Sequence, residues 1–166
     1  MTDVVDAATR SRMMSAIRSK NTKPELNVRT QLHRLGLRFT LGNTTLPGKP
    51  DLAFPRHKAV IFVNGCFWHC HRCNNFRWPS SNTEFWRAKL LGTIARDKRD
   101  IHELGAIGWR VLVIWECAVR HANKQMRNDL YMIVRDWVVN YDSPYIEISK
   151  GQGDGYSKRK STSRSI

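Results

Sequence analysis

Residues 58–73 read KAVIFVNGCFWHCHRC and contain the two features that decide the fold. The apolar run 59–63 is rich in β-branched residues, which is typical of a central strand buried on both faces. The eight residues that follow Gly65 hold three cysteines and two histidines. The sequence therefore predicts a buried strand that leads directly into a cluster of candidate metal ligands.

The segments on either side of this stretch predict an α/β domain with a mixed β-sheet flanked by helices. Apolar periodicity and turn residues predict strands at 37–41, 51–54, 58–64 and 109–115, and helices at 24–35, 84–104 and 124–139. The run 109–115 is almost entirely apolar and is predicted to be a second buried strand. The chain divides into a basic arm or helix at 1–22, a single domain at 23–149 and a basic, disordered tail at 150–166.

The charge of the chain indicates its class of partner. The chain has 166 residues, enough for one domain, and 28 Lys and Arg residues against 14 Asp and Glu residues leave a net charge of +14. Such a surface attracts polyanions, of which nucleic acid is the commonest in a cytoplasm. The longest apolar runs have five residues, whereas a membrane helix needs about 20. With no signal-like N-terminus, we expect a cytoplasmic protein that is not associated with a membrane.

Four cysteines and two histidines are the candidate metal ligands. In a reducing cytoplasm, clustered thiols favour metal or redox chemistry over disulfides. A structural zinc ion needs four nitrogen or sulfur ligands in a closed tetrahedron. The candidates are Cys66, His69, Cys70, His71, Cys73 and Cys117. Cys117 would reach the others if the two buried strands end at the same edge of the sheet. Composition does not select four of the six. A Cys70–Cys73 redox pair, or an iron–sulfur cluster on the three clustered cysteines, lacks the surrounding fold that such sites require.

Acidic residues are scarce in the first half of the chain. Between Asp6 and Glu84 there are only Glu25 and Asp51. Asp51 begins a predicted strand and lies one turn before the strand that leads to His69. A carboxylate at this position could hold Mg²⁺ for phosphodiester hydrolysis while a nearby histidine activates water. Because an Asp after a Pro is also a common turn residue, the residues alone leave both interpretations open.

Six stretches, taken in order, resemble the very short patch repair (Vsr) DNA mismatch endonucleases. They are ATRS at 8–11, LPGKPD at 46–51, VIFVNGCFWH at 60–69, TEFW at 83–86, RDKRD at 96–100 and GWRVLVIWEC at 108–117. The resemblance covers about residues 1–140. It implies a restriction-endonuclease-like fold with a structural zinc site. The implied activity is a Mg²⁺-dependent DNA endonuclease that nicks 5′ to the thymine of a T·G mismatch arising from 5-methylcytosine deamination. The resemblance also implies a monomer that acts on double-stranded DNA in the bacterial cytoplasm, on the nucleoid, alongside mismatch-repair and resynthesis proteins.

The same resemblance implies a role for each matching residue. Asp51 is expected to bind Mg²⁺ together with the backbone carbonyl of Val63. His69 is expected to be the general base, and Glu25 the supporting acid. The implied structural zinc ligands are Cys66, His71, Cys73 and Cys117, which leaves Cys70 as a spare thiol. The chain departs from the family pattern at Asn64, where a histidine is expected, and at Val63, where a threonine is expected.

Adjacent aromatic rings suggest how mismatched DNA would be read. A rigid loop that presents Phe67 and Trp68 suits a wedge between base pairs. The resemblance implies intercalation by these two rings and Trp86 from the major groove, and by Met14 from the minor groove. Lys89, one helical turn from Trp86, is expected to reach a base or phosphate edge. Four basic residues near the N-terminus are expected to contact DNA phosphates, namely Arg10, Arg12, Arg18 and Lys20. Asp97 and Asp100 are expected to lie on a solvent-exposed face of their helix.

Two other functions remain open on the residues alone. A non-catalytic, zinc-stabilised DNA-binding module would explain the charge, the cysteines and the aromatic residues without using Asp51 or His69. A thiol redox protein would use Cys70 and Cys73.

Overall fold

The computed structural model describes residues 6, 8–9, 12, 15, 20–120, 124–140, 143–151 and 156–160. Within these residues lies one five-stranded sheet in the order β1-β2-β3-β4-β5. The strands are β1 (Leu52–Phe54), β2 (Ala59–Asn64), β3 (Arg110–Trp115), β4 (Tyr145–Lys150) and β5 (Tyr156–Lys160). The three central strands run parallel, and β1 and β5 are antiparallel to their neighbours. The predicted mixed sheet is therefore confirmed.

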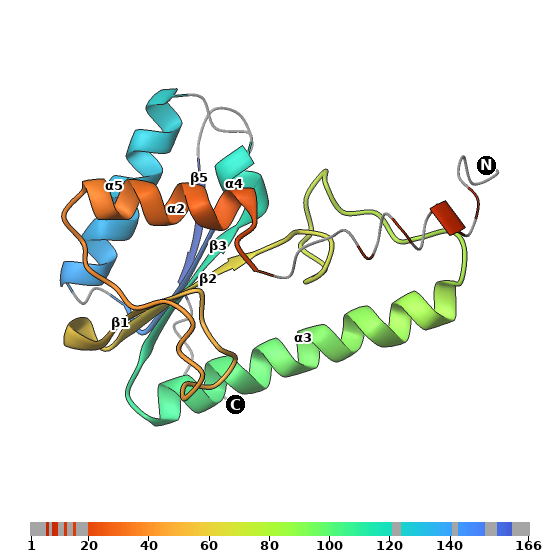
Figure 1. Ribbon diagram of the computed structural model, residues 1–166, viewed down its shortest axis with the longest axis horizontal. Helices are drawn as coiled ribbons and strands as arrows, with labels where there is room; N and C mark the ends of the chain where they lie inside the picture. The colour runs from red at the N-terminus through yellow and green to blue at the C-terminus, as the bar shows by residue number, and fades with distance from the viewer. Residues whose placement is uncertain are drawn as a thin grey trace.

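Helices cover both faces of this sheet. The helices α2 (Lys23–Arg34), α4 (Glu116–Arg120) and α5 (Lys124–Asn140) lie on one face, and the long helix α3 (Thr83–Ala106) lies on the other (Figure 1). The helix α3 also runs far beyond the edge of the sheet, where the loop that follows β2 accompanies it (Figure 1). No helix in the described ranges has the length and apolar character that a membrane span requires.

The two predicted buried strands are buried on both faces, as their continuous apolar sequences indicate. In β2, Ile61 belongs to the core beneath α2 and α5, whereas Val60 belongs to the core beneath α3. In β3, Leu112 belongs to the core beneath α2 and α5, and Val113 belongs to the core beneath α3. Because side chains alternate along a strand, one uninterrupted apolar run supplies both cores.

Parallel pairing sets the position of the site. Asn64 at the end of β2 pairs with Trp115 at the end of β3, so both strands finish at the same edge of the sheet. The turn that joins β1 to β2 is a 3₁₀ helix, Pro55–His57, which returns the chain antiparallel to β1. The loop after β2 and the helix α4 after β3 therefore begin side by side.

Two sequence predictions differ from the structure. The strand predicted at 37–41 is reduced to one isolated bridge between Thr40 and Ala53. The predicted disorder of 150–166 is wrong for Tyr156–Lys160, which form β5. This strand pairs with the open edge of β4, and the Tyr156 hydroxyl donates a 2.8 Å hydrogen bond to the carbonyl of Met126 on α5. Backbone pairing and one tyrosine anchor therefore order a segment whose composition suggested a flexible tail.

Candidate active site and metal centre

Four of the six candidate ligands converge beyond the ends of β2 and β3. One ligand atom from each lies within 4.8 Å of the others, and the set is Cys66, His71, Cys73 and Cys117. Three of them come from residues 66–73, which we call the cysteine loop, and Cys117 comes from the first turn of α4. The other two candidates, His69 and Cys70, are not members of the group that the described residues form.

The donor chemistry of this cluster fits zinc. Soft thiolates and an imidazole in a set of four are the ligands of a structural zinc site. The Nδ1 atom of His71 lies 3.6 Å from the Sγ atoms of both Cys66 and Cys117. A hydrogen bond from the Cys66 thiol lowers the pKa of Cys117 despite its burial, which favours the thiolate form that a zinc ion requires. The Cys/His cluster could therefore bind a zinc ion.

Local packing holds the cysteine loop in this shape. The His71 backbone N–H donates to the Cys66 carbonyl at 2.9 Å, and the His71 ring stacks on Trp115 with a centroid separation of 4.2 Å. Cys70 takes a left-handed conformation (φ 50°) at the turn. The Glu116 carboxylate accepts a 3.3 Å hydrogen bond from the Cys66 N–H, which connects α4 to the loop.

His69 points to a partner that sequence reasoning missed. Its Nδ1 atom lies 2.5 Å from Oδ2 of Asp97 on α3, and both side chains are partly buried. The expectation that Asp97 lies on a solvated helix face is therefore wrong. Its position in the chain is a signal that could have found it, because Asp97 lies between Ile94 and Ile101 on the apolar stripe that connects the buried residues Leu90 and Leu104. The carboxylate orients the imidazole and leaves Nε2 as the ring atom directed at other groups.

Asp51 is held beside the end of β2. Its Oδ2 atom accepts a 2.7 Å hydrogen bond from the Val63 N–H. Burial, the largest cause, and the nearby charge of Glu25 together raise the pKa of Asp51 to about 6, against the opposing effects of that hydrogen bond, Arg29 and His69. A buried carboxylate that resists ionisation gains most from an added cation, so the position is suited to a divalent metal ion.

Beside Asp51, the pairing of β1 with β2 leaves the backbone carbonyl oxygen of Val63 without a hydrogen-bond donor. The Lys58 carbonyl accepts from the Arg110 N–H on β3, so by strand alternation the carbonyls of residues 59, 61 and 63 face β1. The pairing of Leu52 with Ile61, continued by two residues, sets Pro50 opposite Val63. Because proline has no N–H, the Val63 carbonyl has no ladder donor at this position. The carbonyl and the Asp51 carboxylate thus face the same space.

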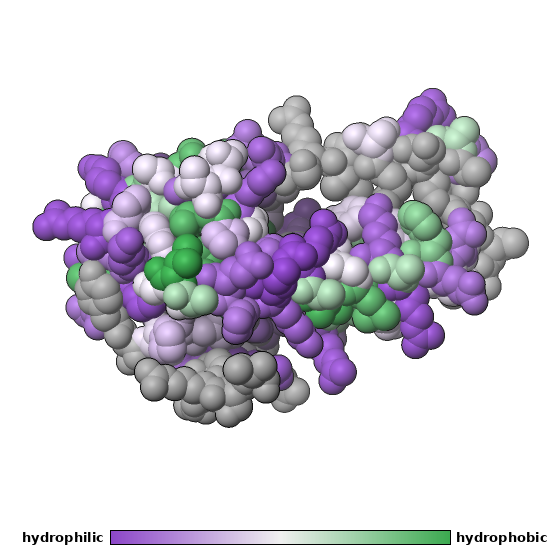
Figure 2. Space-filling view, turned by 90° about the horizontal axis from the view of Figure 1, so that it is seen from below, coloured by the Kyte–Doolittle hydropathy of each residue, from purple (hydrophilic) through white to green (hydrophobic). Residues whose placement is uncertain are grey.

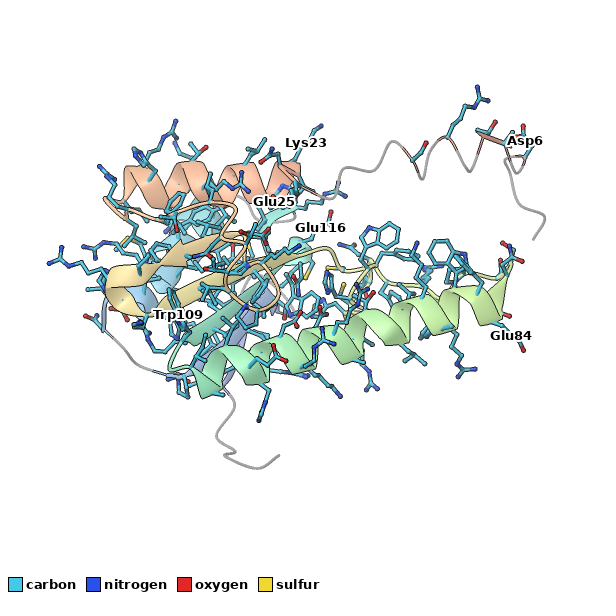
Figure 3. All side chains as sticks on the ribbon, turned by 60° about the horizontal axis from the view of Figure 1, so that its bottom comes forward. Asp6, Lys23, Glu25, Glu84, Trp109 and Glu116 are labelled. Carbon is cyan, nitrogen blue, oxygen red and sulfur yellow. The ribbon has the colours of Figure 1, made fainter. Side chains whose placement is uncertain are left out.

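Glu25 stabilises the start of α2 through hydrogen bonds to the residues before it. It is 3% exposed, and its carboxylate accepts hydrogen bonds from the Asn21 N–H at 2.9 Å and the Thr22 hydroxyl at 3.0 Å. Arg29 forms an ion pair with it at 3.1 Å. The Thr22 hydroxyl in turn accepts from the Glu25 N–H at 3.5 Å, so the pair is a variant of the capping box in which the carboxylate binds the Asn21 N–H. Figure 3 shows Glu25 and Glu116 on the same side of the sheet, from two different helices.

The predicted wedge residues form one aromatic cluster. The ring of Phe67 lies 5.2 Å from that of Trp68 and 5.5 Å from that of Trp86, between centroids. The Lys89 ammonium lies 5.3 Å from the Trp68 ring centroid and 5.4 Å from that of Trp86. The cysteine loop and the first turns of α3 therefore present these rings together. Three predicted DNA contacts, Met14, Arg10 and Arg18, lie outside the described residues.

Similar proteins identify the family. A family model described as DNA mismatch endonuclease Vsr matches residues 2–75. The chain is 42% identical over 138 residues to the DNA mismatch endonuclease Vsr of Escherichia coli (strain K12), covering 83% of this chain and 88% of that protein. It is 46% identical over 117 residues to the type II nicking enzyme V.XorIIP of Xanthomonas oryzae pv. oryzae, covering 70% of this chain and 86% of that enzyme. Among solved structures, the catalytic domain of the homing endonuclease I-Bth0305I is similar with a TM-score of 0.49 and 20% identity, covering 74% of this chain and 100% of that domain.

The two enzymes with 42% and 46% identity favour a DNA-cleaving enzyme over a non-catalytic DNA-binding module or a thiol redox protein. The chain belongs to the Vsr family of DNA mismatch endonucleases, and it is a hydrolase that cleaves DNA.

Proposed function

We propose that this chain is a Mg²⁺-dependent, strand-specific endonuclease that nicks double-stranded DNA 5′ to the thymine of a T·G mismatch arising from 5-methylcytosine deamination. The observation that carries the proposal is the imidazole of His69, oriented by Asp97 at 2.5 Å and near enough to Asp51 for its charge to affect that carboxyl group. Metal-assisted hydrolysis needs at least a carboxylate that binds the cation and an oriented general base near it.

Asp51 and the backbone carbonyl of Val63 would hold the magnesium ion. Hard oxygen ligands of this kind are the ones that Mg²⁺ prefers, and the missing N–H of Pro50 supports a role for the carbonyl. When bound, the ion would offset the negative charge that develops on the phosphate in the transition state. Glu25 acts as the supporting acid: its charge acts on the Asp51 carboxyl group, and its hydrogen bonds to Asn21 and Thr22 hold the first turn of α2.

His69 is the proposed general base. Its Nδ1–H donates to Asp97, so Nε2 accepts the proton that an attacking water molecule releases. The resulting hydroxide forms a bond to phosphorus, and the bond from phosphorus to the leaving sugar oxygen breaks. Asp97 is a positioning residue in this scheme. With Asn64 at the position where the family pattern leads us to expect a second histidine, His69 alone supplies the imidazole.

Mismatch recognition is assigned to the aromatic cluster. Phe67, Trp68 and Trp86 insert at the T·G pair from the major groove, and Met14 inserts from the minor groove. Lys89, already placed over two of these rings, is the cation available to a base or phosphate edge. A structural zinc ion on Cys66, His71, Cys73 and Cys117 would keep the cysteine loop rigid enough for its rings to act as a wedge.

The cellular setting follows from this activity. We place the enzyme in the bacterial cytoplasm, on the nucleoid, as a monomer whose nick is taken over by mismatch-repair and resynthesis proteins. The high positive charge of the chain suits continuous association with DNA.

The test is a nicking assay on a duplex labelled on one strand and carrying a single T·G mismatch. With Mg²⁺ present, we expect one product, cut 5′ to the thymine; without Mg²⁺, or with a fully paired duplex, we expect none. The Asp51→Asn variant should bind the mismatched duplex without cutting it. Asp97→Asn should reduce the nicking rate by about 10²–10⁴-fold, the range of general acid–base catalysis, with binding retained. Cleavage that is independent of Mg²⁺ or of the mismatch would overturn the proposal.

A further inference from the structure

A polar cavity of about 750 Å³ opens beside His69. It lies between the cysteine loop, α3 and the hairpin of β4 and β5. Its lining is rich in cations from all three of these elements, namely Arg72, Lys98, Lys150 and Arg159. Figure 2, which views the molecule from the side that carries α3, shows strongly hydrophilic residues across the middle of this face.

Among the described residues that line this cavity, cationic side chains outnumber carboxylates. One carboxylate, that of Glu147, lines the cavity. Its Oε2 accepts a 3.1 Å hydrogen bond from the Trp115 indole N–H, and its Oε1 accepts a short hydrogen bond from the Tyr145 hydroxyl. Among the residues that the structure describes, none of the four cations forms an ion pair. Unpaired cations that converge on one cavity favour a bound anion.

The strand β5 sets the position of Arg159. Arg159 pairs with Glu147 on β4 and faces the cavity, together with Ser157. The alternate residue Lys158 pairs with Ile148, which belongs to the core on the opposite face of the sheet. Two lysine or arginine neighbours on one strand therefore point to different sides, and only one of them reaches the cavity.

This strand is anchored firmly enough to present a side chain. Besides its pairing with β4, the Tyr156 side chain packs on the core beneath α5 and donates its hydroxyl to the Met126 carbonyl. The Arg159 side chain is therefore carried by a strand whose position is fixed.

We propose that this cavity binds a backbone phosphate of the substrate DNA next to the scissile phosphate, through Arg159 and Lys98. The proposal rests on the proposed function, since His69 both lines the cavity and marks where the scissile phosphate would lie. A DNA strand that presents one phosphate to His69 must pass its next phosphates along the adjoining surface, and this cavity is the cationic part of that surface. Continuity with His69 favours a polymer backbone over a free phosphate ion. The β4–β5 hairpin thereby becomes part of the DNA-binding surface.

The first test measures the salt dependence of DNA binding. The dissociation constant for a fluorescent duplex is followed with increasing KCl in the absence of Mg²⁺, for duplexes with and without the mismatch. Each phosphate contact that is lost should reduce the slope of log Kd against log salt by about 0.9. We expect this reduction for Arg159→Ala and for Lys98→Ala, equally on both duplexes, because a phosphate carries no sequence information. The matched control is Lys158→Ala, which removes the same charge from the same strand and should keep the wild-type slope. Equal slopes for Arg159→Ala and Lys158→Ala would overturn the proposal.

The second test locates the phosphate. Single phosphates near the cut are replaced in turn by uncharged methylphosphonates, and binding to the wild type and to Arg159→Ala is compared. We expect one replacement that weakens wild-type binding severalfold but has no further effect on Arg159→Ala. If every replacement weakens both proteins alike, Arg159 contacts no particular phosphate and the proposal fails. Zinc content and thermal unfolding identical to the wild type confirm that each variant is folded.

The two tests separate this inference from the proposed function. Should the wild type nick the T·G duplex while Arg159→Ala behaves like Lys158→Ala, the phosphate site alone is refuted. Should the wild type fail to nick the mismatch while Arg159→Ala still shows the reduced salt slope, the phosphate site stands and the assigned reaction falls.

Discussion

The buried carboxylate of Asp51 predicts that the metal-free enzyme becomes more stable when this charge is removed. Burial raises the pKa of Asp51 from 3.8 to about 6 in the folded protein. The folded state therefore binds more protons than the unfolded state between these two pH values, and stability falls as the pH rises through this range. At neutral pH, where Asp51 is ionised in both states, the charge costs the fold about 3 kcal/mol, at about 1.4 kcal/mol for each pKa unit.

The substitution Asp51→Asn tests this cost. Asparagine keeps the shape and can still accept the hydrogen bond from the Val63 N–H, while it removes both the buried charge and its repulsion by Glu25. We expect the free energy of unfolding at neutral pH to increase by up to about 3 kcal/mol. Well below pH 3.8, where the carboxyl group is protonated in both states, the difference between the variant and the wild type should disappear. The matched control is Asp129→Asn, an exposed aspartate on α5, which should change stability by less than about 0.5 kcal/mol.

Urea unfolding of zinc-loaded protein, without Mg²⁺ and over a series of pH values, measures these differences. Titration with Mg²⁺ should then stabilise the wild type and leave Asp51→Asn unchanged, because the cation binds the charge that the variant lacks. A variant that is less stable than the wild type at neutral pH would refute the reasoning. Equal stabilisation of both proteins by Mg²⁺ would show that the ion binds elsewhere.

Three further predictions concern the zinc cluster, the wedge and the base. Cys117→Ser should lose zinc and unfold at lower temperature, whereas Cys70→Ser should keep both zinc and stability; equal damage to both would mean that the four ligands are wrongly assigned. Trp68→Ala should weaken binding to a T·G duplex by about 1–3 kcal/mol more than binding to a paired duplex, since stacking is lost only where the ring inserts. An equal loss of binding affinity for both duplexes would instead show that Trp68 serves only to pack the loop. His69→Ala should abolish nicking with zinc content unchanged, whereas His71→Ala should release zinc; the reverse pattern of metal content would exchange their roles.

Short-range patterns in the sequence determined much of the architecture. The uninterrupted apolar runs at 59–63 and 111–115 are enough to predict two central strands, because a strand buried on both faces leaves no position for a polar side chain. Pro24 after a threonine cap likewise predicts the start of α2, and Thr22 does accept a hydrogen bond from the Glu25 N–H. These signals depend on neighbours within a few residues.

The resemblance in sequence also determined the family and a set of site residues. Without it, six metal-ligand candidates and two acids remained, with no means of choosing among them. Composition counts such side chains but carries no information on the distances between them.

Tertiary structure decided which distant groups meet. Parallel pairing of β2 with β3 ends both strands at one edge and brings Cys117 within 4.8 Å of ligand atoms in the cysteine loop. The packing of α3 against the sheet brings Asp97 to His69, 28 residues away in the chain. The free edge of β4 recruits β5, a segment with no apolar periodicity of its own. Local propensities act over a turn or a strand, whereas these contacts exist only once the strands have paired and the helices have packed, and that is why the centre of this enzyme depends on the fold as a whole.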